Sequence, residues 1–105
     1  MGIANNKLAI LVLAAGQSAR LGQMKQLITI KDKSLVEWQL AQALHVSDQV
    51  YCVLGFKANQ VQARIDHLPI TTIINSTWSE GMASSIALGV DALAPDTQAV
   101  MIILV

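Results

Sequence analysis

Four apolar stretches of the chain alternate with longer segments in which apolar residues recur every three or four positions. The apolar stretches are continuous rather than alternating, as expected for parallel strands that are buried on both faces. They cover residues 7–13, 50–54, 70–74 and 99–105. The segments between them that have the spacing of amphipathic helices cover residues 34–45, 57–67 and 82–93. The pattern therefore predicts four strands separated by three helices.

Local signals support these helix assignments. Ser34 followed by Glu37 matches the S-x-x-E capping box, which predicts that the first helix begins at Ser34. Pro69 fits just after the end of the second helix. The residues expected to face the core from the first helix are Val36, Leu40, Ala43 and Leu44, and those from the third helix are Ile86, Val90 and Leu93.

Strands that are separated by helices must be joined by crossovers, which are right-handed in nearly all proteins. We therefore predict an α/β fold: a three-layer α/β/α sandwich with a mainly parallel sheet. Residues 1–6 are expected to form a flexible leader, and residues 7–105 a single unit. If the strand order is 3-2-1-4, the order reverses between strands one and four. Ligands of such sheets bind there, at the carboxyl ends of the strands.

Composition narrows the functional classes. Hydrophobic residues make up 53% of the chain and charged residues 13%, which fits a sheet buried on both faces or a domain part that lacks its cover. A net charge of zero gives no electrostatic sign of nucleic-acid binding, and no apolar run reaches the roughly 18 residues of a membrane span. Cys52 is the single cysteine, which excludes an internal disulfide. With no signal-peptide pattern at the start, these features favour a cytoplasmic protein.

The stretch after the first predicted strand, residues 13–27, reads LAAGQSARLGQMKQL. Glycines let a backbone approach a ligand so that its N–H groups converge on an anion, and fixed cations neutralise the remaining charge. Gly16 and Gly22 are one residue too far apart for the Walker A loop, and Gly16-Gln17-Ser18 does not fit the dinucleotide fingerprint. The stretch has the outline of a phosphate-binding loop that follows neither of these two patterns.

It fits L-A-A-G-x-S-x-R-[ML]-G-x-x-K-x-L along its whole length, and residues 75–85 fit N-x-x-W-x-x-G-M-x-S-S. Both stretches resemble motifs of the MobA-like molybdopterin nucleotidyltransferases, most closely the molybdenum-cofactor cytidylyltransferases. The resemblance covers nearly the whole chain from Lys7 onward. It implies a fold of the nucleotide-diphospho-sugar transferase, or Rossmann-like, type.

The resemblance also implies a reaction, in which a nucleotide monophosphate moves from an NTP to a molybdopterin-type acceptor and pyrophosphate is released. Arg20 would hold the β- and γ-phosphates, and Lys25 would meet the charge that grows at the α-phosphate. These two residues are the predicted catalytic residues. The predicted nucleotide-binding residues are Leu13, Ala14, Ala15, Gly16, Gln17, Ser18, Arg20, Lys25, Asn75, Gly81, Ser84 and Ser85. Because Ala14-Ala15-Gly16 resembles the cytidylyl branch, CTP is the first expected nucleotide and GTP the second.

The family carries a metal-binding aspartate directly after the fourth strand, and Val105 is the last residue before that position. The resemblance thus implies Mg²⁺ in the complete enzyme and no metal ligand within these 105 residues. We expect the chain to be the amino-terminal part of a longer domain, with little or no transfer activity alone. We also expect an apolar edge at residues 99–105 to be exposed, through which the chain could self-associate.

Other interpretations stay open. The same fold could use a sugar phosphate as acceptor, or the chain could be a non-catalytic module that binds a nucleotide or a partner protein. Residues 13–27 could be a tight connection between a strand and a helix, with Arg20 and Lys25 as surface cations. Asn75 could contact the base or brace its own loop, and Ser84 or Ser85 could bind the base and ribose or serve only the helix.

Overall fold

The computed structural model describes residues 8–15 and 29–105. The elements in chain order are β1 (Leu8–Ala14), β2 (Thr29–Ile30), β3 (Lys33–Ser34), α1 (Leu35–Val46), β4 (Gln49–Leu54), α2 (Ala58–Ile65), β5 (Thr71–Ile74), the 3-10 helix η4 (Trp78–Glu80), α3 (Met82–Asp91) and β6 (Ala99–Leu104). The predicted leader, residues 1–6, lies outside the described residues.

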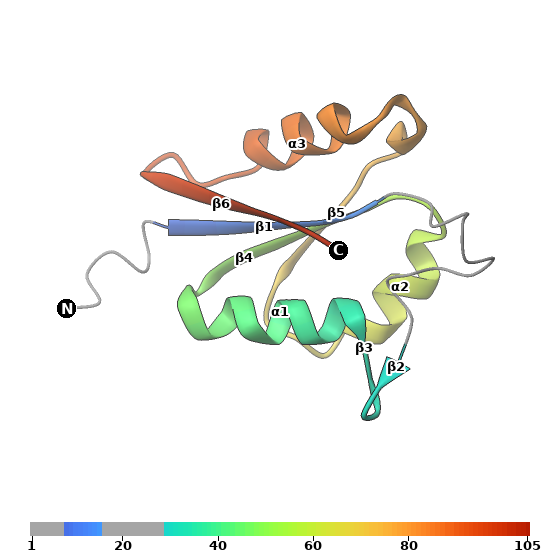
Figure 1. Cartoon of the computed structure of the whole chain (residues 1–105). Helices are drawn as coiled ribbons and strands as arrows, with labels where there is room; N and C mark the ends of the chain where they lie inside the picture. Colours follow the sequence, from blue (N-terminus) through green and yellow to red (C-terminus); the bar gives the residue numbers. More distant parts are fainter. Residues whose placement is uncertain (1–7, 16–28) are drawn as a thin grey trace.

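The four longer strands form one parallel sheet in the order β5-β4-β1-β6. β1 is therefore central, and the strand order reverses between β1 and β6, as predicted. Figure 1 shows α1 and α2 on one side of the sheet and α3 on the other. The prediction of a three-layer α/β/α sandwich is confirmed.

Burial on both faces explains why β1 is apolar without interruption. Successive side chains of a strand point to opposite faces. Ile10 and Val12 belong to a buried cluster that includes residues of α1 and α2, whereas Leu11 and Leu13 belong to a cluster packed against Ile86 of α3. Every position of β1 after Leu8 is buried, so a polar side chain would disturb the core on either face.

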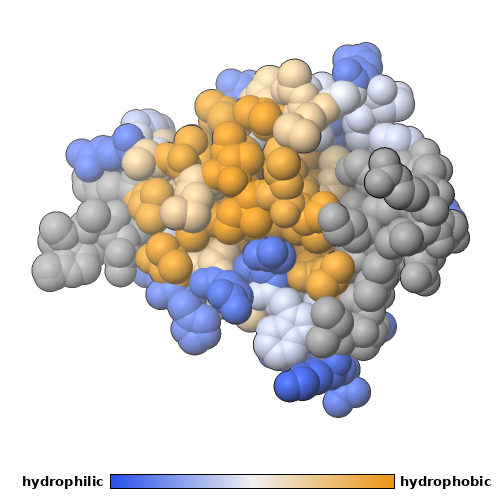
Figure 2. All heavy atoms as spheres, in the orientation of Figure 1, coloured by the Kyte–Doolittle hydropathy of each residue, from blue (hydrophilic) through white to orange (hydrophobic). Residues whose placement is uncertain are grey.

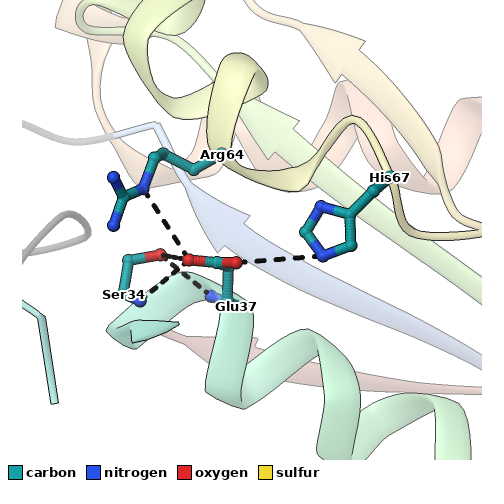
Figure 3. A network of polar contacts seen from close by, with 4 residues as sticks. All are labelled: Ser34, Glu37, Arg64 and His67. Atoms are coloured by element: carbon teal, nitrogen blue, oxygen red, sulfur yellow. Dashed lines mark hydrogen bonds and ion pairs between the residues drawn. The ribbon is translucent and has the colours of Figure 1, made fainter. Parts of the chain in front are cut away.

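The capping box at the start of α1 is present. Glu37 donates its backbone N–H to the Ser34 hydroxyl (3.4 Å), and the Glu37 carboxylate accepts from the Ser34 N–H and hydroxyl (2.9 Å each). The same carboxylate lies 3.7 Å from Nε of Arg64 and 3.8 Å from Nε2 of His67 (Figure 3). This network connects the start of α1 to the end of α2 and the residues that follow it.

The predicted core stripe of α1 is confirmed, but that of α3 is partly wrong. The buried residues of α3 are Ser85 and Gly89, whereas Val90 is 46% exposed. A Cβ on Gly89 would lie 2.5 Å from Cδ1 of Leu11, so Leu11 fills the space that a side chain would need. The helix packs through its smallest residues, which apolar periodicity cannot reveal.

A short hairpin precedes α1. β2 pairs antiparallel with β3, and the two residues between them, Lys31 and Asp32, both have positive φ (51° and 71°). Positive φ at both positions is typical of the tight hairpin turn that matches strand twist. The pairing of these two short strands is not among the elements that the hydrophobic pattern predicts.

β6 forms an edge of the described sheet and is largely exposed. Its apolar side chains include Val100, Met101, Ile102 and Leu104, which are 38% to 56% exposed. Figure 2 shows a broad apolar area across the middle of this face of the molecule. The predicted exposed apolar edge is therefore confirmed. Within the described part of the chain, no helix is long and apolar enough to cross a membrane.

Candidate nucleotide-binding site

The carboxyl ends of the four parallel strands meet at one edge of the sheet. Backbone hydrogen bonds continue beyond the ends of the strands. The Val105 N–H donates to the Leu13 carbonyl (3.2 Å), and the Phe56 N–H donates to the Ala15 carbonyl (2.9 Å). Asn75 N–H likewise bonds to a carbonyl at the end of β4 (2.7 Å). This edge includes the switch point between β1 and β6, where sheets of this type bind ligands.

The two motifs, about 60 residues apart in sequence, are connected to this one edge. Leu13, Ala14 and Ala15 lie at the end of β1 and are 6%, 1% and 5% exposed. Asn75, Gly81, Ser84 and Ser85 follow β5 or begin α3. The predicted residues Gly16, Gln17, Ser18, Arg20 and Lys25 lie outside the described residues, so their contacts with phosphate remain predictions.

Asn75 is the centre of a hydrogen-bond network and is 3% exposed. Its Nδ2 donates to the hydroxyls of Ser84 (3.0 Å) and Ser85 (2.9 Å). Its Oδ1 accepts from the N–H (3.0 Å) and hydroxyl (2.9 Å) of Thr77. Both amide protons and both oxygen lone pairs are thus used. Asn75 braces the loop after β5 against the first turn of α3, and a direct bond to a nucleotide base would require it to release one of these partners.

The two serines differ in how they could meet a ligand. Ser85 is 3% exposed and serves as a partner of Asn75. Ser84 is half-buried, and its hydroxyl lies 2.8 Å from the Gly81 carbonyl oxygen and 3.2 Å from that of Thr77. In this arrangement Ser85 supports the loop, while Ser84 lies closer to the surface.

Gly81 fixes the start of α3. It has φ +112°, a value that L side chains rarely adopt, and the space beside its Cα is open. Gly81 is the N-cap of α3 and has no side chain to cap the helix, and Met82 and Ala83 after it are exposed. The open helix start therefore lies beside the loop that Asn75 braces.

The turn after β4 also contributes to this edge, through Gly55, Phe56 and Lys57, and the sequence motifs do not predict this. Phe56 and Trp78 pack edge to face, with ring centroids 5.2 Å apart and planes at 68°. Lys57 has a left-handed backbone (φ 50°), and its Nζ lies 5.5 Å from the centre of the Phe56 ring. A glycine directly after a buried strand is the signal that could have identified this turn.

The described residues do not fit a metal centre. Within residues 8–15 and 29–105, no three His, Cys, Asp or Glu side chains are grouped so that they could hold a metal ion. Cys52 is buried in the core, and burial raises the pKa of its thiol to about 12, so the thiol stays protonated at neutral pH.

A parallel four-stranded sheet with helices on both sides, in which the first motif begins at the end of the central strand, defines an α/β protein. Residues 10–105 match the MobA-like NTP transferase domain, and the chain belongs to that family.

Two relatives of known name align with most of the chain. It is 37% identical over 97 residues to the nicotine blue oxidoreductase of Paenarthrobacter nicotinovorans, with 90% of this chain and 47% of that protein aligned. It is 26% identical over 84 residues to the molybdenum cofactor cytidylyltransferase of Escherichia coli (strain K12), with 79% and 44% aligned.

The solved structures agree on the fold. Rv0371c from Mycobacterium tuberculosis H37Rv superposes with a TM-score of 0.80 at 28% identity, covering 95% of this chain and 51% of that one. A structure of Rv0371c described as a complex with manganese gives a TM-score of 0.77 at 23% identity, covering 94% and 50%. The chain thus spans about half the length of the proteins it matches.

Proposed function

We propose that this chain forms the nucleotide-binding part of a nucleotidyltransferase that transfers a nucleotide monophosphate to a molybdopterin-type acceptor. The observation that carries the proposal is the position of the 13–27 motif. It begins at the buried carboxyl end of the central strand, beside the switch point between β1 and β6. Family membership and the similarity to the E. coli cytidylyltransferase support the same reaction class.

In the proposed reaction, an oxygen of the acceptor's terminal phosphate bonds to the α-phosphorus of the NTP. The bond from that phosphorus to the bridging oxygen breaks, and pyrophosphate leaves with the bonding electrons. Catalysis of this kind depends mainly on positioning and charge stabilisation. Backbone amides from Ala14 to Ser18 hold the triphosphate, Arg20 binds the β- and γ-phosphates, and Lys25 stabilises the charge at the α-phosphate. In the longer protein, Mg²⁺ or another divalent ion would neutralise part of the triphosphate charge.

The base and ribose are assigned to the second motif. Its loop is held in one shape by Asn75, which leaves Gly81 and the first amides of α3 at the surface. We propose that the small residues there admit the base, with Ser84 as a hydrogen-bond partner. CTP is the preferred nucleotide, and GTP is the second choice.

A calorimetric titration with CTP, GTP and ATP in the presence of Mg²⁺ tests the proposal. The variant Arg20→Ala/Lys25→Ala is compared with Lys33→Ala/Arg64→Ala, which removes the same charge outside the motif. We expect CTP binding that only the first double variant loses. Equal losses in both would show a general charge effect, and no binding by a folded chain would contradict the proposal for this chain. Repeating the titration on a chain extended past Val105 shows whether residues beyond Val105 are needed for nucleotide binding.

A second candidate is an oxidoreductase, because the chain is 37% identical to a protein of that name. The same titration therefore includes a reduced nicotinamide dinucleotide. Binding of the dinucleotide without any NTP would favour redox chemistry. A nucleotidyltransferase with a sugar-phosphate acceptor would bind NTP as proposed, and it would be recognised by pyrophosphate release with sugar phosphates in the longer protein.

We also propose that the chain self-associates through β6. Five of the six residues of this edge strand are exposed, and the strand contains no charge or proline that would oppose pairing with another strand. Sedimentation velocity over a hundredfold concentration range is expected to show a reversible dimer that the substitution Ile102→Lys abolishes. A monomer at all concentrations would contradict this proposal.

A further inference from the structure

Three segments of the chain meet at Gly55, where Trp78 and Ala15 leave no room for a further side chain. A Cβ placed on Gly55 would lie 2.5 Å from Cβ of Trp78, 2.8 Å from Cγ of Trp78 and 2.9 Å from the Ala15 carbonyl oxygen. All three distances are shorter than real Cβ contacts. Any side chain at this position would therefore displace Trp78, Ala15 or both.

Ala15 is the last described residue before the segment that carries Arg20 and Lys25. Its carbonyl accepts the Phe56 N–H at 2.9 Å, so a hydrogen bond joins it to the turn after β4. Ala15 itself is 5% exposed, so the residues packed around it determine its position.

Trp78 brings the second motif to the same point. Its ring packs edge to face on Phe56 at 5.2 Å, and its neighbour Thr77 is held by Asn75. The loop after β5 is therefore connected to the end of β1 across the turn after β4. A displacement of Trp78 would be transmitted to both motifs.

We infer that Gly55 and Trp78 are positioning residues for nucleotide binding, which act through Ala15 without touching the phosphates. This inference rests on the proposed function. The amides that cradle a phosphate must converge on one point, and a misplacement of about 1 Å can reduce the rate of an enzyme about a hundredfold. Gly55 holds the start of the 13–27 motif where convergence is possible, and Trp78 aligns the second motif with it.

Gly89 offers a matched control. A Cβ on Gly89 would lie 2.5 Å and 2.7 Å from the two methyl carbons of Leu11, distances as short as those at Gly55. Leu11 is part of the core beneath α3, three residues before the end of β1, so the overlap does not press on the Ala15 carbonyl. Gly89→Ala thus introduces an overlap at similar distances in another place, although the end of the Leu11 side chain can shift more easily than the Ala15 backbone.

The experiment measures the CTP dissociation constant and backbone amide exchange for the wild type, Gly55→Ala and Gly89→Ala, at a temperature where circular dichroism shows each to be folded. We expect Gly55→Ala to weaken CTP binding at least tenfold and to accelerate exchange of the Phe56 N–H at least tenfold relative to the β1 amides. Gly89→Ala is expected to keep CTP affinity within threefold. Equal weakening in both variants, or none in Gly55→Ala, would overturn the inference.

Two further arms keep the outcomes separate. If the wild type binds no nucleotide, the proposed function fails for this chain, and the exchange data decide the inference: unchanged protection of Phe56 in Gly55→Ala overturns it. If Gly55→Ala does not fold, Trp78→Leu replaces it, because it keeps the Cβ and removes the ring that contacts Phe56. Its expected effect is a three- to tenfold loss of CTP affinity, and affinity equal to that of the wild type would overturn the inference.

Discussion

Replacing Asn75 by alanine should destabilise the protein, because the side chain braces the loop after β5. The substitution removes four hydrogen bonds, two to serine hydroxyls and two from Thr77. A net contribution of about 1 kcal/mol for each bond gives an upper value of about 4 kcal/mol. Thr77 is exposed and Ser84 is half-buried, so water can replace part of the loss, but Ser85 is buried. We therefore expect a loss of roughly 2–3 kcal/mol in the free energy of unfolding.

Urea unfolding followed by circular dichroism measures this loss, provided that the slope of free energy against urea is unchanged. Asn75→Asp should cost less than Asn75→Ala, because its carboxylate still accepts from Thr77 and the serine hydroxyls can turn to donate to it. Asn59→Ala is the control, since Asn59 is exposed in α2 and should change stability by less than about 0.5 kcal/mol. A cost below about 1 kcal/mol for Asn75→Ala would refute the bracing role.

Two more predictions concern residues remote from the site. Burial of Glu37 tends to raise its pKa, but hydrogen bonds from Ser34 and the charges of Arg64 and His67 outweigh this, so its pKa lies below the ordinary value of 4.5. The contribution of Glu37 to the free energy of unfolding is therefore complete above pH 4.5 and disappears as the pH falls through its lower folded pKa. In urea unfolding measured at several pH values, Glu37→Gln should reduce the loss of stability at acid pH. An unchanged loss would argue against this role of Glu37. Burial raises the pKa of the Cys52 thiol to about 12, so the thiol should resist iodoacetamide at pH 8 while the protein is folded. It should react once urea unfolds the protein. Rapid labelling of the folded chain would contradict the core position of Cys52.

The strand pattern and the capping box could be predicted from the sequence because each depends on a local rule. Continuous apolar runs indicate strands buried on both faces, and β1 is such a strand. Ser34 and Glu37 satisfy each other's backbone within one turn, so their spacing alone identifies the start of α1.

The rest depends on contacts between distant segments. Gly89 allows α3 to approach Leu11, and Gly55 allows Trp78 to approach Ala15; neither partner can be read from spacing in the chain. For Asn75, the sequence leaves open whether the side chain meets the base or the loop, because an amide suits both. The structure shows the partners within the loop that occupy it.

We propose that a nucleoside triphosphate binds at the carboxyl edge of the sheet, between the end of β1 and the start of α3. Backbone amide shifts recorded during a titration with CTP and Mg²⁺ test it most directly. We predict saturable shifts at Ala14, Ala15 and residues 81–84, with the β2–β3 hairpin and the first residues of β6 unchanged. Shifts concentrated at the hairpin or at β6, with the end of β1 unaffected in a folded protein, would contradict it.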